Sequence, residues 1–119
     1  MITYSLPLIK PRRLDPGQTL GVVAPAYTVG EDDRIHAGVE TVESLGFRVK
    51  PGHSLFRRHG YFAGTDQERA SDLNAMFADP DVAGIICLRG GYGASRTLPY
   101  LDFDLIRRNP KPLIGYSDI

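Results

Sequence analysis

A serine near the carboxyl end of the sequence is the strongest candidate for a nucleophile. Ser117 comes shortly after a short apolar run, Leu113–Ile114, and precedes Asp118 and Ile119. A serine on a sharp turn after a strand resembles a nucleophile elbow, which exposes Oγ above the sheet and lets the next N–H stabilise an oxyanion. Ile119, however, stands where the Gly-x-Ser-x-Gly motif of α/β-hydrolases has glycine. The alternative is that Ser117 or Asp118 is an ordinary helix N-cap.

A glycine-rich segment, Arg89 to Gly93, is the second place where chemistry could occur. Glycines let backbone N–H groups turn outward and approach a ligand closely, so this segment could hold an anion or a developing oxyanion. It could equally be a tight turn that only needs positive φ. A non-catalytic phosphate or nucleotide site is a further alternative, although the sequence has neither a Gly-x-Gly-x-x-Gly opening the first helix nor a Walker loop.

The segments around these two motifs predict strands that alternate with helices. Short apolar runs predict four strands, at residues 20–24, 47–50, 82–88 and 111–115. Helical spacing of apolar side chains predicts four helices, at residues 32–45, 65–79, 94–98 and 102–107. Thr65 and Glu68 form a capping-box pattern at the start of the second helix. Residues 54–65 have no clear period and predict a loop.

This alternation predicts an α/β fold with a mostly parallel sheet flanked by helices. We expect a three-layer domain of the flavodoxin-like or class I amidotransferase-like kind over residues 18–119, preceded by an irregular N-terminal arm over residues 1–17. Ligands of open parallel sheets bind beyond the carboxyl ends of the strands. The glycine-rich segment and Ser117 should therefore meet at one edge of the sheet.

The composition limits the partners of the protein. The 119 residues include 14 lysines and arginines and 14 aspartates and glutamates, so the formal net charge is zero. This balance argues against binding to nucleic acid or to an anionic membrane. No apolar run approaches the ~18 residues of a membrane helix, and residues 1–13 lack the apolar region of a secretory signal. We expect a cytoplasmic protein without metal or cofactor, because no His, Cys and Asp spacing predicts a metal site.

We expect the cysteine to be a buried structural residue and the histidines to be exposed at the surface. Cys87 lies within a predicted strand, and a single cysteine cannot form an internal disulfide, so we expect a small buried hydrophobic residue. His36, His53 and His59 all precede Ser117 in the sequence. We expect these three side chains at the surface.

Four motifs, in this order, resemble those of the LD-carboxypeptidases (muramoyltetrapeptide carboxypeptidases and microcin-immunity serine peptidases). They are Gly21 to Ala26, Gly64-Thr65-Asp66 with Arg69 and Asp72-Leu73, Arg89 to Gly93, and Gly115 to Asp118. The resemblance covers residues 18–119 and matches the N-terminal domain of that family. It implies a Ser–His–Glu serine peptidase that removes the terminal D-alanine from a murein tetrapeptide in cell-wall recycling. An immunity-type hydrolase acting on an antibiotic conjugate is the alternative within the family.

The resemblance also assigns roles to individual residues. It implies that Ser117 is the nucleophile and that the N–H of Asp118 contributes to the oxyanion hole. A glycine of the glycine-rich segment supplies the second N–H, and we expect Gly91 rather than Gly90. Arg89 could pair with a substrate carboxylate or bridge to an aspartate. Tyr92 could line the substrate groove or anchor its loop.

The family's glutamate and histidine lie in a C-terminal domain that follows the nucleophile, and this sequence ends two residues after Ser117. A serine hydroxyl is a weak nucleophile without an adjacent base, so we expect this chain alone to be inactive. A domain separated from its partner exposes apolar surface, and large apolar patches drive association. We therefore expect a homodimer or self-association of the chain. The resemblance implies a murein peptide as the substrate.

Overall fold

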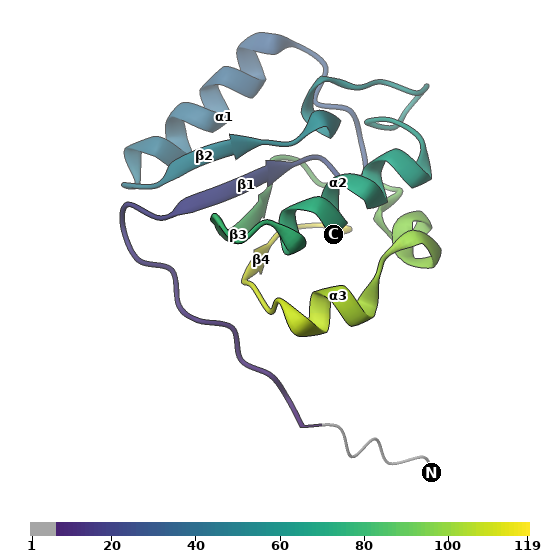
Figure 1. Ribbon diagram of the computed structural model, residues 1–119. Coiled ribbons are helices and arrows are strands. Elements are labelled where there is room, and N and C mark those ends of the chain that lie inside the picture. The colour runs from purple at the N-terminus through teal and green to yellow at the C-terminus, as the bar shows by residue number, and fades with distance from the viewer. Residues whose placement is uncertain (1–6) are drawn as a thin grey trace.

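A computed structural model describes residues 7–119, and the first six residues of the predicted N-terminal arm lie outside the described part. Residues 7–18 form neither helix nor strand. This segment runs toward the N-terminus from the start of the first strand (Figure 1), and Arg12 and Arg13 line a hollow together with Val82 and Ala83. The remaining residues build one sheet with helices packed against it.

The sheet has four parallel strands in the order β2-β1-β3-β4. The strands are β1 (Thr19–Val23), β2 (Arg48–Pro51), β3 (Val82–Cys87) and β4 (Leu113–Ile114). This is the order of the first four strands in flavodoxin-like folds. The prediction of a mostly parallel sheet flanked by helices is confirmed, with each strand within about two residues of its expected position.

The two long helices pack against opposite faces of the sheet, which gives three layers (Figure 1). Helix α1 (Asp32–Ser44) shares a core cluster with Val22 of β1, and Ile86 of β3 packs against that cluster. Helix α2 (Asp66–Ala78) covers the other face, where the short helix α3 (Phe103–Arg108) joins it. Successive side chains of a strand point to opposite faces, so each central strand contributes to both clusters.

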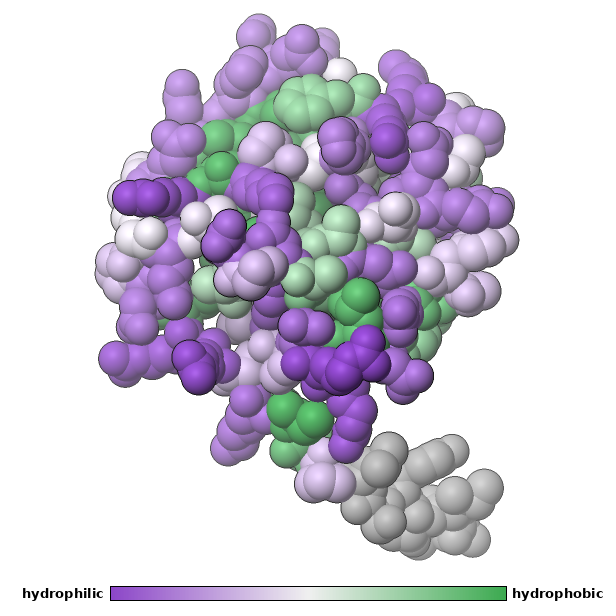
Figure 2. All heavy atoms as spheres, in the orientation of Figure 1, coloured by the Kyte–Doolittle hydropathy of each residue, from purple (hydrophilic) through white to green (hydrophobic). Residues whose placement is uncertain are grey.

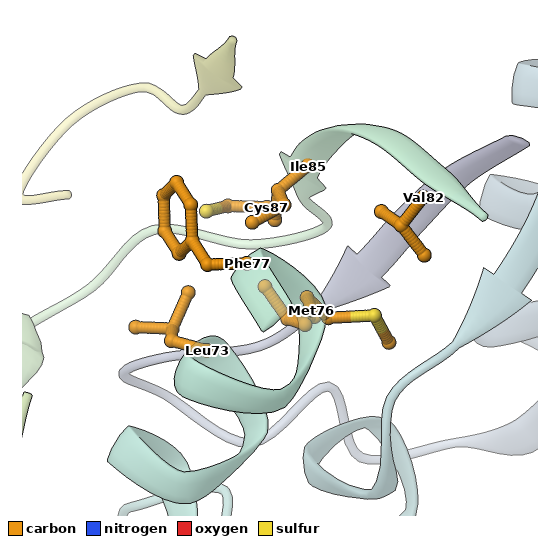
Figure 3. Packing of buried hydrophobic residues seen from close by; sticks show 7 residues of the cluster. Leu73, Met76, Phe77, Val82, Ile85 and Cys87 are labelled. Carbon is orange, nitrogen blue, oxygen red and sulfur yellow. The ribbon is translucent and has the colours of Figure 1, made fainter. Parts of the chain in front are cut away.

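The α2 face of the core is closely packed around β3 (Figure 3). Leu73, Met76 and Phe77 lie at helical spacing on α2 and contact the β3 cluster that contains Ile85 and Cys87. Cys87 is 4% exposed, and its burial raises the pKa of the thiol to about 12. The prediction that Cys87 is a small buried hydrophobic residue is confirmed.

Helix α2 begins with the predicted capping box. The N–H of Glu68 donates to Oγ1 of Thr65 at 3.1 Å, and the N–H of Thr65 donates to Oε1 of Glu68 at 3.0 Å. These reciprocal bonds satisfy two N–H groups that the first turn of a helix leaves without partners. The start of α2, and with it the direction of its side chains, is therefore fixed by local sequence.

Two connecting segments differ from the prediction. The expected loop at 54–65 starts with a 3-10 turn, η1 (His53–Phe56), whose Ser54 and Leu55 are buried. The expected short helix at 94–98 is a longer 3-10 segment, η2 (Ala94–Tyr100), which contains Pro99. Tight turns of this kind are common connectors, and an apolar pattern does not distinguish them from loops or short α-helices.

The surface is mixed in polarity. Hydrophilic residues dominate the face shown in Figure 2, with hydrophobic side chains visible between them. Several large apolar residues at and near β4 are exposed: Leu98, Leu113, Ile114 and Ile119. His36, His53 and His59 are exposed, as predicted. Among residues 7–119, no helix has the length and apolar character required to cross a membrane.

Candidate active site

The glycine-rich segment and the turn that carries Ser117 (residues 115–118, the serine turn) lie side by side because their strands are neighbours. β3 pairs in parallel with β4, with Ile85 opposite Leu113 and Ile86 opposite Ile114. The chain leaves β3 into Arg89 to Gly93 and leaves β4 into Gly115 to Ser117, so both segments emerge at the carboxyl edge. The expected meeting of the two motifs is thus present.

Ser117 has the backbone geometry of a strained turn. Its φ is 59°, and within residues 7–119 it is the one residue other than glycine with positive φ. Left-handed backbone costs a side-chain-bearing residue of order 1 kcal/mol or more, and such strain gathers at functional sites. The side chain is exposed, and its hydroxyl makes no hydrogen bond to the described residues. A hydroxyl presented in this way is accessible from solvent.

Gly90 brings the two segments into direct contact. A Cβ placed on Gly90 would lie 2.8 Å from the carbonyl oxygen of Tyr116 and 3.0 Å from Cβ of Ser117. Both atoms belong to the serine turn, one of them to its backbone, so any side chain at position 90 would displace that turn. Glycine is required here by close approach.

Gly91 has a different constraint. Its φ is 97°, and an added Cβ would lie 2.8 Å from Cβ of Tyr27. Tyr27 follows β1, so Gly91 connects the glycine-rich segment with the loop after the central strand. Positive φ and close packing together explain why two successive glycines stand here.

A hollow of about 540 Å³ lies where these segments meet. Its lining combines residues that follow β1 (Val29, Arg34, Gly38), residues at the end of β3 (Leu88, Arg89, Gly90, Gly91) and residues after β4 (Tyr116, Ser117). In a sheet of this strand order, the connection from β1 to β2 crosses one face and the connection from β2 to β3 crosses the other. Ligands bind in the crevice that this leaves between the carboxyl ends of β1 and β3. The hollow lies at this crevice.

The predicted site residues divide between two hollows. Arg89, Gly90, Gly91 and Ser117 line the first one. Tyr92 and Asp118 line a second hollow of about 530 Å³, whose walls include the apolar side chains Leu73, Leu98, Leu101, Leu113 and Ile119. The serine turn separates the two, since successive residues of the turn line different hollows. The expected groove residue Tyr92 therefore does not share a cavity with Ser117.

Arg89 does not bridge to an aspartate. Its guanidinium carbon lies 4.0 Å from the centroid of the Tyr27 ring, and no carboxylate of the described residues lies within 4.0 Å of its nitrogens. Tyr27 in turn meets Tyr61 edge-on, with ring centroids 4.3 Å apart. Of the two alternatives for Arg89, the bridge to an aspartate is wrong, and a cation–π contact holds the side chain instead.

A buried arginine holds the loops behind the hollow. Arg69 of α2 is fully buried and donates to the carbonyl oxygens of Pro25 (2.9 Å), Gly64 (2.6 Å) and Gly93 (3.1 Å). These oxygens belong to the loop after β1, the loop before α2 and the glycine-rich segment. One side chain thus fixes three segments that are far apart in the sequence.

Asp66 completes this network. It accepts a hydrogen bond of 2.7 Å from Nη2 of Arg69 and two of 3.2 Å from Nε of Arg96. Partial burial by itself would raise the pKa of Asp66, but the hydrogen bonds from Arg69 and Arg96 outweigh it and lower that pKa below its ordinary value. The carboxylate is therefore ionised at neutral pH and balances the buried guanidinium.

Asp72 plays a similar part on the next turn of α2. Its carboxylate accepts from the backbone N–H groups of His53 (3.1 Å) and Ser54 (3.0 Å), and from the hydroxyl of Ser54. Oγ of Ser54 accepts from the N–H of Ala24 at 2.9 Å, just after β1. Arg69 and Asp72 belong to one of the four motifs named above, but the sequence pattern predicted no structural role for either side chain. A sequence feature that could have indicated these roles is the position of Arg69 and Asp72 on the helix face that otherwise carries Leu73 and Met76.

No metal-binding cluster is present in the part of the chain that the structure covers. No group of three or more His, Cys, Asp or Glu side chains lies close enough there to hold a metal ion. The hollow is lined by Ser117, by Gly90 and Gly91 and by two arginines, Arg34 and Arg89.

The fold and the site together define an α/β domain with a serine turn at the carboxyl edge of a parallel sheet. Residues 20–119 match the family described as "LD-carboxypeptidase N-terminal domain". The chain therefore belongs to the LD-carboxypeptidase family and is its N-terminal domain. The resemblance inferred from four motifs is confirmed.

Individual relatives agree with this assignment. A Bacillus subtilis protein named "Probable murein peptide carboxypeptidase" is 44% identical over 110 residues, which are 92% of this chain and 34% of that protein. The murein tetrapeptide carboxypeptidase of Pseudomonas aeruginosa is 38% identical over 101 residues, 84% of this chain and 33% of that protein. The chain spans about a third of the length of these curated relatives.

Solved structures give the same result. The microcin C7 self-immunity protein MccF superposes with a TM-score of 0.85 at 35% identity, over 93% of this chain and 33% of that chain. MccF has also been solved in complex with aspartyl sulfamoyl adenosine and as an active-site mutant in which a serine, an asparagine and a lysine are replaced by alanine. The match confirms the α/β fold.

Proposed function

We propose that this chain is the nucleophile-bearing part of a serine-type LD-carboxypeptidase, which releases the terminal D-alanine of a murein tetrapeptide in cell-wall recycling. The observation that carries the proposal is the turn at Ser117: positive φ, an exposed hydroxyl and direct packing against Gly90. The name of the Pseudomonas aeruginosa relative, murein tetrapeptide carboxypeptidase, supports this substrate.

In the proposed reaction, Oγ of Ser117 attacks the carbonyl carbon of the scissile amide, which lies in the first hollow. The N–H groups of Gly91 and Asp118 stabilise the oxyanion that forms. Each such donor contributes ~2.7–4 kcal/mol in comparable sites. The active-site mutant of MccF, in which a serine is among the replaced residues, supports a serine at this centre in a related protein.

The proton of Ser117 needs an acceptor that residues 7–119 do not place beside it, because the hydroxyl has no hydrogen-bond partner there. We assign this role to a histidine, oriented by a glutamate, in the family's C-terminal domain. Losing triad members removes several orders of magnitude of rate and leaves only oxyanion and binding effects. The chain alone is therefore expected to be inactive.

The second candidate function is the immunity type, in which the hydrolase cleaves an antibiotic conjugate. The observation that favours it is the likeness to MccF, at a TM-score of 0.85. MccF binds aspartyl sulfamoyl adenosine in one of its structures. Both candidate functions use the same serine turn and differ in the group that leaves.

We also propose a cytoplasmic location and self-association of the chain through its exposed apolar surface. Leu98, Leu113 and Ile119 are each more than a third exposed and line the second hollow together. Sedimentation at increasing concentration tests the association. A rise in mean mass supports it, and a monomer at every concentration contradicts it.

The test of the function compares this chain with a longer form that continues through its own downstream reading frame. Each is incubated with a murein tetrapeptide and, separately, with an aspartyl–adenylate-type conjugate. Release of D-alanine by the longer form alone supports the carboxypeptidase. Cleavage of the conjugate without release of D-alanine favours the immunity type, and cleavage of neither substrate rejects both.

A further inference from the structure

Two arginines stand beside the candidate nucleophile. The first hollow is lined by Arg34, Arg89 and Ser117, and its remaining lining residues are uncharged. No aspartate or glutamate contributes to its walls. A hollow with two positive charges and no negative one attracts an anion. Its volume of about 540 Å³ is in the range of small-molecule and peptide-end sites.

The side chain of Arg89 is held in place although its N–H groups donate no hydrogen bond to the described residues. Its guanidinium lies 4.0 Å from the centroid of the Tyr27 ring, and the side chain is half-buried. Within the described residues it forms no ion pair and no side-chain hydrogen bond. A planar guanidinium has five N–H donors in a fork that matches a carboxylate, so an immobilised and unpaired arginine is suited to bidentate recognition.

Arg34 approaches the same hollow from a different element. It lies in the first turn of α1, next to Asp32 and Asp33, but no carboxylate of residues 7–119 is within 4.0 Å of its charged group. Its side chain is exposed and lines the hollow with Arg89. The charge of Arg34 is thus available to a ligand as well.

We propose that Arg89, assisted by Arg34, binds the free terminal carboxylate of the substrate peptide next to Ser117. This inference rests on the proposed function, since a carboxypeptidase must distinguish a chain end from an internal residue. An arginine that pairs with the terminal carboxylate places the last amide of the peptide near the serine turn. It therefore explains why one residue is removed from the end.

The carboxylate is favoured over a phosphate by the site's construction. A carboxylate is planar and presents two oxygens to one guanidinium, which suits the single arginine held on Tyr27. The glycine-rich segment lies in the same wall, where its N–H groups are assigned to the oxyanion instead. A phosphate on a nucleotide conjugate is the alternative anion, and the experiment distinguishes the two.

The test measures binding and so does not depend on turnover. The longer form carrying Ser117→Ala is titrated calorimetrically with two tetrapeptides that differ only in their end, D-alanine carboxylate or D-alanine amide. We expect the carboxylate peptide to bind about 30-fold tighter, as for a charge-assisted bidentate pair. Adding Arg89→Gln should reduce this preference to about 3-fold or less, and adding Arg34→Gln should reduce it to about 10-fold.

Two controls separate a specific role from a general one. Arg48→Gln changes an exposed arginine on β2 and should leave the preference unchanged. Arg89→Lys keeps the charge but not the fork, so its preference should fall between those of arginine and glutamine. Equal binding of the two peptides, or an unchanged preference in Arg89→Gln, overturns the inference. Inorganic phosphate displacing the carboxylate peptide at submillimolar concentration also overturns it.

Hydrolysis by the unmutated longer form distinguishes this inference from the proposed function. If D-alanine is released but Arg89→Gln leaves the carboxylate preference intact, the function stands and the inference fails. If D-alanine is not released but the preference depends on Arg89, the carboxylate site stands and the function fails.

Discussion

The guanidinium of Arg69 donates a hydrogen bond of 3.1 Å to the carbonyl oxygen of Gly93. Gly93 ends the glycine-rich segment, and Arg69 is completely buried on α2. The same side chain binds carbonyl oxygens of the loops at Pro25 and Gly64. The shape of the serine site therefore depends on an arginine that does not line its hollow.

Arg69→Met should destabilise the domain strongly. The methionine leaves three buried carbonyl oxygens without their donor and removes one of the two arginines that bind the Asp66 carboxylate. Such a disrupted buried network costs about 3 kcal/mol or more. Urea unfolding measures this loss. Arg96→Met is the matched control, because Arg96 binds the same carboxylate from a half-exposed position and its loss should change stability little. Similar losses in the two variants would contradict the role of Arg69.

The Asp66 network also predicts an acid-sensitive stability. The pKa of Asp66 is lower in the folded state than its ordinary value of 3.8. The ionised carboxylate therefore contributes to the free energy of unfolding at pH values above 3.8, and this contribution is lost as the pH falls through the folded-state pKa. Asp66→Asn should therefore lose less stability than the unmutated protein when the pH is taken from about 6 to about 3. Thermal unfolding at both pH values checks this, with the exposed Asp104→Asn as a control that keeps the full dependence.

Gly90→Ala should impair catalysis more than folding. The new methyl group would lie 2.8 Å from the carbonyl oxygen of Tyr116, so the serine turn must move. A displacement of the order of 1 Å at a catalytic group costs about 100-fold in rate. D-alanine release by the longer form measures this effect, and Ser71→Ala, at an exposed position of α2, should retain full activity. Full activity of Gly90→Ala would show that the contact between the two segments is not needed.

Cys87 should be inert in the folded protein. Burial raises the pKa of its thiol to about 12, and the thiolate is the reactive form. A thiol-directed chromogenic reagent at about pH 8 should modify Cys87 only after unfolding in denaturant. Rapid modification of the folded protein at that pH would contradict the packing of β3 against α2.

The arrangement of strands and helices could be predicted because each signal is local. The capping box is contained in the four residues from Thr65 to Glu68, and the apolar run at 82–88 is enough to predict a buried strand. The rule that the carboxyl ends of parallel strands lie at one edge predicted that both motifs are at that edge of the sheet. These features need no knowledge of distant contacts.

The contacts that shape the site could not be predicted in the same way. Arg69 bonds to residues 44 and 24 positions away, and Arg89 lies over Tyr27, which follows a different strand. Such pairings depend on the three-dimensional register of loops, which no periodicity encodes. The same reason explains why Tyr92, three residues after Arg89 in sequence, lines another hollow.

The most direct test of the central claim is to ask whether Ser117 is the nucleophile. The longer form is incubated with a murein tetrapeptide to measure D-alanine release, and with a fluorophosphonate, after which the modified peptide is identified by mass spectrometry. We predict release of D-alanine, loss of at least about 1000-fold of that rate in Ser117→Ala, and the phosphonyl group on Ser117. Undiminished release by Ser117→Ala, or modification of a different serine with loss of activity, would contradict the account.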